Sequence, residues 1–184
     1  MNVDLNNTNE YDKHVIFLNS KNGTYNDNSS FDFYIKFEDP IKNISNVKII
    51  DASLILESSA ERILNIDDIY YIELNDYHRT FSYIKDKNMT FDKNMTFKYF
   101  DHIYYNKSDH NETAGKLSKF KVSYPATLSN WTDPSLYTLN PIAHNITRFT
   151  IKIRDKDLNV LTKEEGDSFN MTICVYTIKK NIYG

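Results

Sequence analysis

Histidines are the side chains of this 184-residue chain that most readily bind a metal or transfer a proton near neutral pH. Five are spread along the sequence: His14, His78, His102, His110 and His144. None lies in an H-E-x-x-H segment or at the Cys/His spacing of a zinc site. His102 and His110 form the nearest pair, on an expected strand and in the loop after it. The spacing therefore predicts no metal site and no cofactor, unless the fold brings this pair together.

One acidic loop resembles the start of a calcium-binding loop. Asp155, Asp157 and Asn159 alternate in the way that the oxygen ligands of such a loop do. Val160 replaces the glycine expected at the sixth position, and Gly166 replaces the glutamate expected at the twelfth. We therefore predict a solvated connection between two strands here, and no cation site.

Nucleophiles and acid–base pairs are equally sparse. Cys174 is the sole cysteine, and alternation places it on the solvent face of its strand, where we interpret it as an ordinary strand residue. The acidic pairs Asp67-Asp68 and Glu164-Glu165 fall in expected loops and are interpreted as solvated surface. No nucleophile elbow, phosphate loop or dinucleotide motif occurs, and the four glycines leave little material for one. The sequence predicts no catalytic residue and no enzyme.

Composition argues against several other classes of protein. The net charge is −3, from 22 basic and 25 acidic residues without a block of either sign, so a nucleic-acid-binding surface is not expected. A single cysteine cannot form an internal disulfide. No apolar run approaches the roughly 20 residues of a membrane helix, and the first residues lack a signal pattern. We expect a soluble protein made in a reducing compartment.

Strands are the elements that must position these residues, because 14 Tyr and 11 Phe with only four Gly favour a pleated sheet. Two runs near the end of the chain flank the acidic loop as an apparent hairpin, each with one apolar and one polar face. Such faces are typical of an antiparallel sheet that is packed on one side. The apolar faces are Phe149, Ile151 and Ile153 in the first run, and Phe169, Met171, Ile173 and Val175 in the second.

Seven further strands are expected at 14–19, 31–37, 47–56, 70–74, 80–84, 97–105 and 120–124. Phe31, Phe33, Ile35 and Phe37 should face the core in the second of these, and Ile50, Ala52, Leu54 and Leu56 in the third.

The connections between these strands are also predicted. Asp39-Pro40 should end the strand at 31–37, and 41–46 should turn the chain into the next one. The strands at 70–74 and 80–84 should form a hairpin. Residues 57–69 are the best helical candidate, and 125–141 reads as an extended connection.

The fold class that follows is all-β: an antiparallel, single jelly-roll β-sandwich with long loops and a possible extra hairpin. An immunoglobulin-like sandwich is the closest rival, but its Cys…Trp…Cys pattern is absent. We expect a flexible arm at 1–12 and one domain at 13–184. Residues 75–135, which contain a duplicated hexad at Lys87–Lys98, would form an elaborated loop or hairpin region.

Glycan acceptor triplets are unusually common. Eleven N-x-S/T triplets occur, where chance would give about three. They include Asn22, Asn28, Asn88, Asn94, Asn145 and Asn170. Threonines that alternate along strands and the repeated hexad account for several of them. We interpret the triplets as unmodified, since no signal sequence is apparent.

The order of these segments resembles one protein family. H-V-I-F-L-N-S-K-N (14–22), F-D-F-Y-I-K-F-E-D-P-I-K-N-I-S-N-V-K-I-I-D-A-S-L (31–54), Y-Y-I-E-L (70–74) and N-I-T-R-F-T-I-K-I-R-D-K-D…S-F-N-M-T-I (145–173) resemble the penton and minor capsid proteins of virophages and nucleo-cytoplasmic large DNA viruses. Leu158-Asn159 stands where those proteins commonly carry a glycine. The resemblance covers the first third and the last quarter of the chain.

What this resemblance implies is a single jelly roll that forms a homopentamer at the icosahedral vertex of a virion, beside the major capsid protein, after synthesis in the host cytoplasm. A minor or cement capsid protein is the nearest alternative. Another is a carbohydrate-binding module for host attachment, with Trp131, Tyr104 and Tyr105 as a stacking platform. An enzyme on a β-sandwich or cupin-like barrel ranks last, because it needs a cluster of His and carboxylates.

Overall fold

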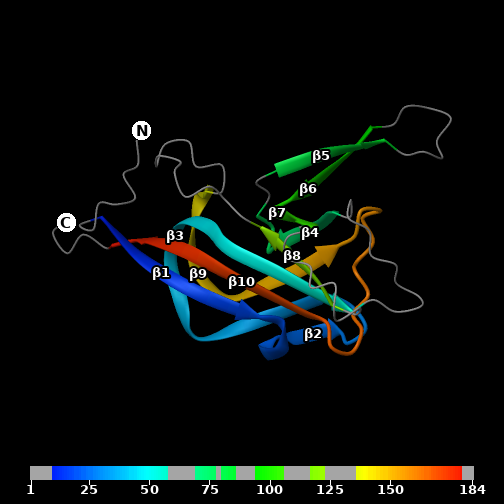
Figure 1. Cartoon of the computed structure of the whole chain (residues 1–184). Helices are drawn as coiled ribbons and strands as arrows, with labels where there is room; N and C mark the ends of the chain where they lie inside the picture. Colours follow the sequence, from blue (N-terminus) through cyan, green and yellow to red (C-terminus); the bar gives the residue numbers. More distant parts are fainter. Residues whose placement is uncertain are drawn as a thin grey trace.

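The computed structural model describes residues 10–57, 69–77, 80–85, 94–105, 117–122 and 136–179, and this part of the chain is nearly all β (Figure 1). It contains one short 3₁₀ turn and no α-helix. The elements are β1 (Tyr11–Asn19), η1 (Ser20–Asn22), β2 (Thr24–Asp27), β3 (Asp32–Glu57), β4 (Ile69–Leu74), β5 (Thr80–Lys85), β6 (Asn94–Tyr99), β7 (Asp101–Tyr105), β8 (Leu117–Val122), β9 (Leu136–Arg154) and β10 (Ser168–Ile178).

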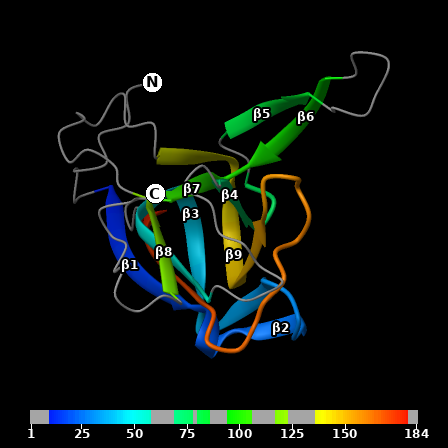
Figure 2. The ribbon, with the colours of Figure 1, turned by 45° about the vertical axis from the view of Figure 1, so that its right-hand side comes forward.

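One antiparallel sheet contains eight of these strands. Its order is β1-β10-β3-β8-β7-β4-β9, with β2 paired to β3. Because β9 also pairs with β3, the path of pairings returns to a strand that it has already passed, and the sheet curls around its own apolar face (Figures 1 and 2). The β5–β6 hairpin is a separate two-stranded sheet that projects from the end of the curl. The prediction of an all-β, antiparallel protein is confirmed.

The core lies inside the curl and is rich in phenylalanine. Phe33 on β3 packs edge-on against Phe169 on β10, with ring centroids 6.4 Å apart. Phe37 and Phe149 join β3 to β9 in the same way at 5.3 Å. The predicted apolar faces of β9 and β10 are confirmed, since their seven side chains are at most 1% exposed. Each fully buried phenylalanine contributes on the order of 2 to 3 kcal/mol of transfer free energy.

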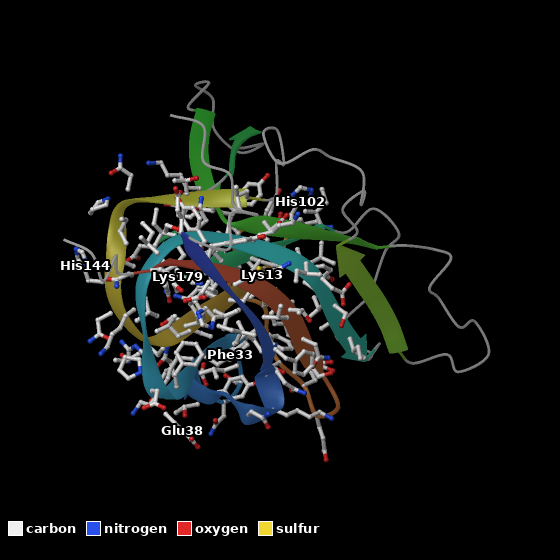
Figure 3. The ribbon with its side chains drawn as sticks, turned by 90° about the vertical axis from the view of Figure 1, so that its left-hand side faces the viewer. Lys13, Phe33, Glu38, His102, His144 and Lys179 are labelled. Atoms are coloured by element: carbon white, nitrogen blue, oxygen red, sulfur yellow. The ribbon has the colours of Figure 1, made fainter. Side chains whose placement is uncertain are left out.

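β3 is longer than its sequence predicts. The expected strands at 31–37 and 47–56 are parts of one strand of 26 residues, so the predicted turn at 41–46 is wrong. The strand bends between these two parts. A register shift against β9 lies between Lys36 and Ile41, and Asn43 has a positive φ of 54°, so the chain changes direction without leaving the sheet. Figure 3 shows Glu38 at the outer rim of this bend and Phe33 inside it. One strand thereby serves both halves of the curled sheet.

A bulge reverses the prediction for Ile50. Its side chain is 43% exposed, whereas Val47 and Ile49 are fully buried. The register between β10 and β3 shifts between Thr172 and Ile173, which pair with Asp51 and Ile49. Ile50 is therefore the extra residue of the bulge, and the inward phase changes there. The other three predicted residues of this face, Ala52, Leu54 and Leu56, are buried as expected.

Three predicted pairings or boundaries are wrong. β4 pairs with β7 and β9, and β5 pairs with β6, so 70–84 is not a hairpin. β9 and β10 each pair with β3 and lie on its two sides, so the acidic loop does not close a hairpin. The run 97–105 is divided at Phe100, which is buried and donates its backbone N–H to the carbonyl of Ile72 at 2.8 Å.

Several boundaries also differ from expectation. β9 begins at Leu136, inside the predicted connection 125–141, and β1 begins at Tyr11, inside the predicted arm. Residues 1–9 and most of the helical candidate at 57–69 lie outside the described residues, as does the first copy of the duplicated hexad. The described residues contain no helix of the length and apolarity that a membrane crossing requires.

Candidate interaction surfaces

An exposed apolar patch lies on the outer face of β1, β10 and β3. We define the β1 patch as Val15, Phe17 and Ile50, which are 61%, 63% and 43% exposed. Val15 stands opposite Cys174 and Phe17 opposite Thr172 across the β1–β10 ladder. Residues that are opposite each other in a ladder share a face, and Thr172 and Cys174 alternate along β10 with core residues, so Val15 and Phe17 point away from the core. Ile50 joins them as the exposed residue of the β3 bulge.

The patch borders an edge of the sheet. β1 pairs with β10 and with no other described strand, so its second row of backbone N–H and C=O groups has no strand partner in the described part of the chain. An edge strand that also exposes large apolar side chains favours association with another chain. The surface is suited to protein contact.

Cys174 lies beneath this patch, and its predicted exposure is wrong. Its side chain is 1% exposed, because it occupies a central strand between Val15 on β1 and Lys48 on β3. Burial raises the pKa of the thiol, and the Tyr176 side chain and the charges of Lys13 and Lys48 offset this only in part. A shielded, protonated thiol is a poor nucleophile, so the geometry gives Cys174 a packing role.

A second surface feature is an open hollow of about 670 Å³ beside the turn that follows β4. We call it the β9 groove. Tyr77 contributes to its wall and stacks on Tyr137, with ring centroids 5.4 Å apart. The remaining lining is apolar along one stretch of β9 and polar beside β4. The apolar stretch is Leu139, Pro141, Ile142, Ala143 and Ile146, and the polar residues include Glu73, Asn75, Asp76, Arg148, Thr150 and Lys152.

Charges of both signs line the groove. Two of them are already neutralised, because Arg154 donates its Nε–H to Glu73, and Lys152 Nζ lies 3.1 Å from Asp32. Arg148 lies over the ring of Tyr34, with its guanidinium carbon 5.1 Å from the centroid. Neither Arg148 nor Asp76 forms an ion pair with a described residue. The groove therefore offers one cation and one anion to a ligand.

The acidic loop is held by its own hydrogen bonds. The carboxylate of Asp155 accepts the backbone N–H groups of Asp157 and Asn159, both at 2.9 Å. Leu158 takes a positive φ of 67°, a conformation that glycine adopts more readily than other residues. Asp155 thus caps a turn, and no cluster of three potential metal ligands occurs in the part of the chain that the structure describes.

Only one member of the His102–His110 pair lies in the described structure. His102 lies on β7, and His110 lies outside the described residues, as does His78. His144 is exposed on the outer side of β9 (Figure 3). His14 lies on β1, with its Nε2 3.1 Å from the hydroxyl of Thr177, so the three described histidines stand on three strands.

Some of the other candidate residues from the sequence lie in the described structure, and others lie outside it. Glu164 and Glu165 lie in the loop before β10, where the Glu164 N–H donates to the carboxylate of buried Asp167 at 2.8 Å. Asp67, Asp68 and Trp131, and the side chains of Tyr104 and Tyr105, lie outside the described residues.

The alternation of polar and apolar residues does not predict the β1 patch, although the sequence carries one signal of it. Residues 15–18 read V-I-F-L, an uninterrupted apolar run in which the alternation of a one-sided strand fails. On an edge strand such a run puts apolar side chains on both faces. Leu18 enters the core at 1% exposure, whereas Val15 and Phe17 remain outside.

Comparison of the chain with protein-family models and with curated proteins found no match in either.

Proposed function

We propose that this protein is a structural capsid protein with a single jelly-roll fold, and that it assembles as a homopentamer at the icosahedral vertices of a virion. The β1 patch is the observation that carries the proposal. It places Val15, Phe17 and Ile50 in solvent on an otherwise well-buried sheet protein. In this role the protein has no catalytic residue, and its partners are further copies of itself and the major capsid protein.

Association through the β1 patch has a sufficient driving force. Burying a large apolar side chain contributes on the order of 1.5 to 3 kcal/mol, and three such side chains lie within one surface. A contact between this patch and a different surface of the next copy is heterologous, and such contacts close into a ring when the rotation from one copy to the next closes. The curled antiparallel sheet and the sequence resemblance to penton proteins are consistent with a ring of five.

Native mass spectrometry over a range of protein concentrations tests this proposal. We expect a pentamer, alone or once the major capsid protein is added. Phe17→Asp should shift the distribution towards monomer, because it places a charge in the apolar contact. Thr24→Asp, which adds the same charge at an exposed position on β2, is the matched control and should leave assembly unchanged. A monomer under all of these conditions, with no association with virions, would overturn the proposal.

The minor or cement role is distinguished by the same measurements. A cement protein shares the fold and the apolar surface, but it binds capsomers without forming a ring of its own. Association with the major capsid protein, in the absence of any homopentamer, would select that role.

A further inference from the structure

The β9 groove exposes a line of backbone groups as well as side chains. β9 pairs with β3 along most of its length, and β4 covers the opposite edge only between Ile151 and Arg154. Asn75 continues that cover by one residue, since its backbone N–H donates to the carbonyl of Thr150 at 2.8 Å. Beyond Thr150, towards Leu139, no described strand pairs with this edge of β9.

Strand geometry fixes which peptide groups face the groove. The N–H and C=O of one residue point to the same side of an antiparallel strand, and the side alternates along the chain. Both groups of Thr150 point away from β3, because both bond to Asn75. The groups of Arg148, two residues away in the part of β9 that pairs with β3 in continuous register, therefore point the same way, into the open edge. They continue the line that β4 would have covered had it not turned at Asn75.

The side chains around this edge add apolar contact and charge. Ala143 and Ile146 are half-buried beside it, and Leu139 lies deeper at 6% exposure. Arg148 on β9 and Asp76 on the turn after β4 both line the groove, without ion-pair partners among the described residues. An acidic and a basic side chain on one ligand would satisfy both.

We propose that the β9 groove binds an extended peptide segment of a partner protein, which adds as an antiparallel strand at Arg148, on the edge of β9 that no described strand covers. Main-chain hydrogen bonds hold the segment, an apolar side chain enters the hollow beside Ile146, and a carboxylate of the segment pairs with Arg148. This site is separate from the β1 patch, and the inference does not depend on the capsid assignment.

A peptide fits this groove better than a sugar does. Saccharides bind on an accessible aromatic face, but the Tyr77 ring is stacked on Tyr137. A free strand edge instead presents donors and acceptors in the spacing of another backbone. The groove combines an apolar hollow with a strand edge and two charges that have no pairing partner among the described residues, and this combination matches the chemistry of an alternating peptide.

The test uses a short acetylated and amidated peptide of alternating valine and threonine that carries one glutamate and one lysine. Titration into the isotopically labelled full-length protein should shift the backbone amide signals of Arg148 and its neighbours on β9. It should also slow the hydrogen exchange of the Arg148 amide. A second peptide with the two charges exchanged tests the direction of binding, and Arg148→Glu should reverse the preference between the two peptides.

Arg148→Pro is the decisive variant. Proline removes the N–H that faces the open edge and leaves the backbone hydrogen bonds between β9 and β3 in place, because the Arg148 N–H points away from β3. We expect about tenfold weaker peptide binding. Arg148→Ala removes the same side chain and keeps the N–H, so it separates the backbone effect from the lost charge. Unchanged amide exchange elsewhere in β3 and β9 shows that the Arg148→Pro variant remains folded.

Three results would overturn the inference. The first is the absence of binding by either peptide at millimolar concentration. The second is binding that Arg148→Pro and Arg148→Ala weaken equally. The third is a panel of oligosaccharides that shifts the same amides where the peptides do not.

Discussion

Asn75 and Thr150 are joined by two hydrogen bonds at the point where β4 ends and the edge of β9 becomes free. The backbone N–H of Asn75 donates to the Thr150 carbonyl at 2.8 Å, and the Thr150 N–H donates to the Asn75 side-chain oxygen at 2.7 Å. The side-chain oxygen of Asn75 therefore accepts the hydrogen bond that a backbone carbonyl of a longer β4 would accept, while the chain turns away from β9. Its φ of 47° lies in the left-handed region that asparagine tolerates.

Replacing Asn75 should separate these two roles. Asn75→Ala removes the acceptor and strains the backbone, so we expect the free energy of unfolding to fall by about 2 to 4 kcal/mol. Asn75→Gly removes only the acceptor and should cost about 1 to 2 kcal/mol. Urea unfolding measures both. Asp76→Ala, at the exposed neighbouring position, is the control and should change stability by less than about 0.5 kcal/mol. Equal stability of the Ala and Gly variants would show that backbone strain is absent.

Gly23 is required for space at the edge of the core. A Cβ at this position would lie 2.5 Å from Cδ2 of Phe33, whose side chain is fully buried. Its φ of −82° is open to any residue, so crowding is the sole objection to alanine. We expect Gly23→Ala to lower the free energy of unfolding by about 1 to 3 kcal/mol.

The same substitution in a Phe33→Leu background tests the cause. Leucine is smaller than the ring that meets the new methyl group, so the penalty of Gly23→Ala should shrink there. A penalty that is equal in the two backgrounds would point to the backbone of the η1 turn instead.

Sequence patterns predicted most strands because alternation is a local property. Phe149, Ile151 and Ile153 face the core as their spacing requires. The phase of Ile50 was not predictable in this way, since it depends on a bulge against β10, a strand that lies more than a hundred residues further along the chain. The continuity of β3 through Pro40 likewise depends on the strands that pair with it.

Pairing partners were also beyond the local pattern. Nearness in sequence favoured hairpins between 70–74 and 80–84 and around the acidic loop, but long-range pairing to β3, β7 and β9 replaced both. The candidate surfaces depend on these pairings. Val15 and Phe17 are exposed because β1 is an edge, and the β9 groove exists because β4 is shorter than β9.

Cys174 should be unreactive in the folded protein. Burial raises the pKa of its thiol, which lowers the thiolate fraction, and the side chain is 1% exposed. A disulfide-exchange reagent at mildly alkaline pH should therefore label native protein far more slowly than protein unfolded in guanidinium. Slow labelling should follow transient opening of the sheet, so destabilising variants such as Gly23→Ala should accelerate it. Labelling of native and unfolded protein at the same rate would contradict the position of Cys174 between β1 and β3.

Stability should fall at alkaline pH through Tyr77. Burial raises the pKa of its phenol above the ordinary value of 10.0; the nearby Asn75 side chain lowers it in part, and Tyr137 and Asp76 raise it further. The unfolded chain therefore loses this proton at a lower pH than the folded protein. Its contribution to stability is fully present below pH 10 and is lost as the pH rises from there through the folded-state pKa.

Tyr77→Phe removes the proton, so its free energy of unfolding should fall less steeply above pH 10 than that of the wild type. Denaturant unfolding at a series of pH values measures the difference between the two proteins, with the difference at neutral pH as the baseline. A difference that stays constant across the alkaline range would mean that Tyr77 titrates alike in the folded and unfolded chains.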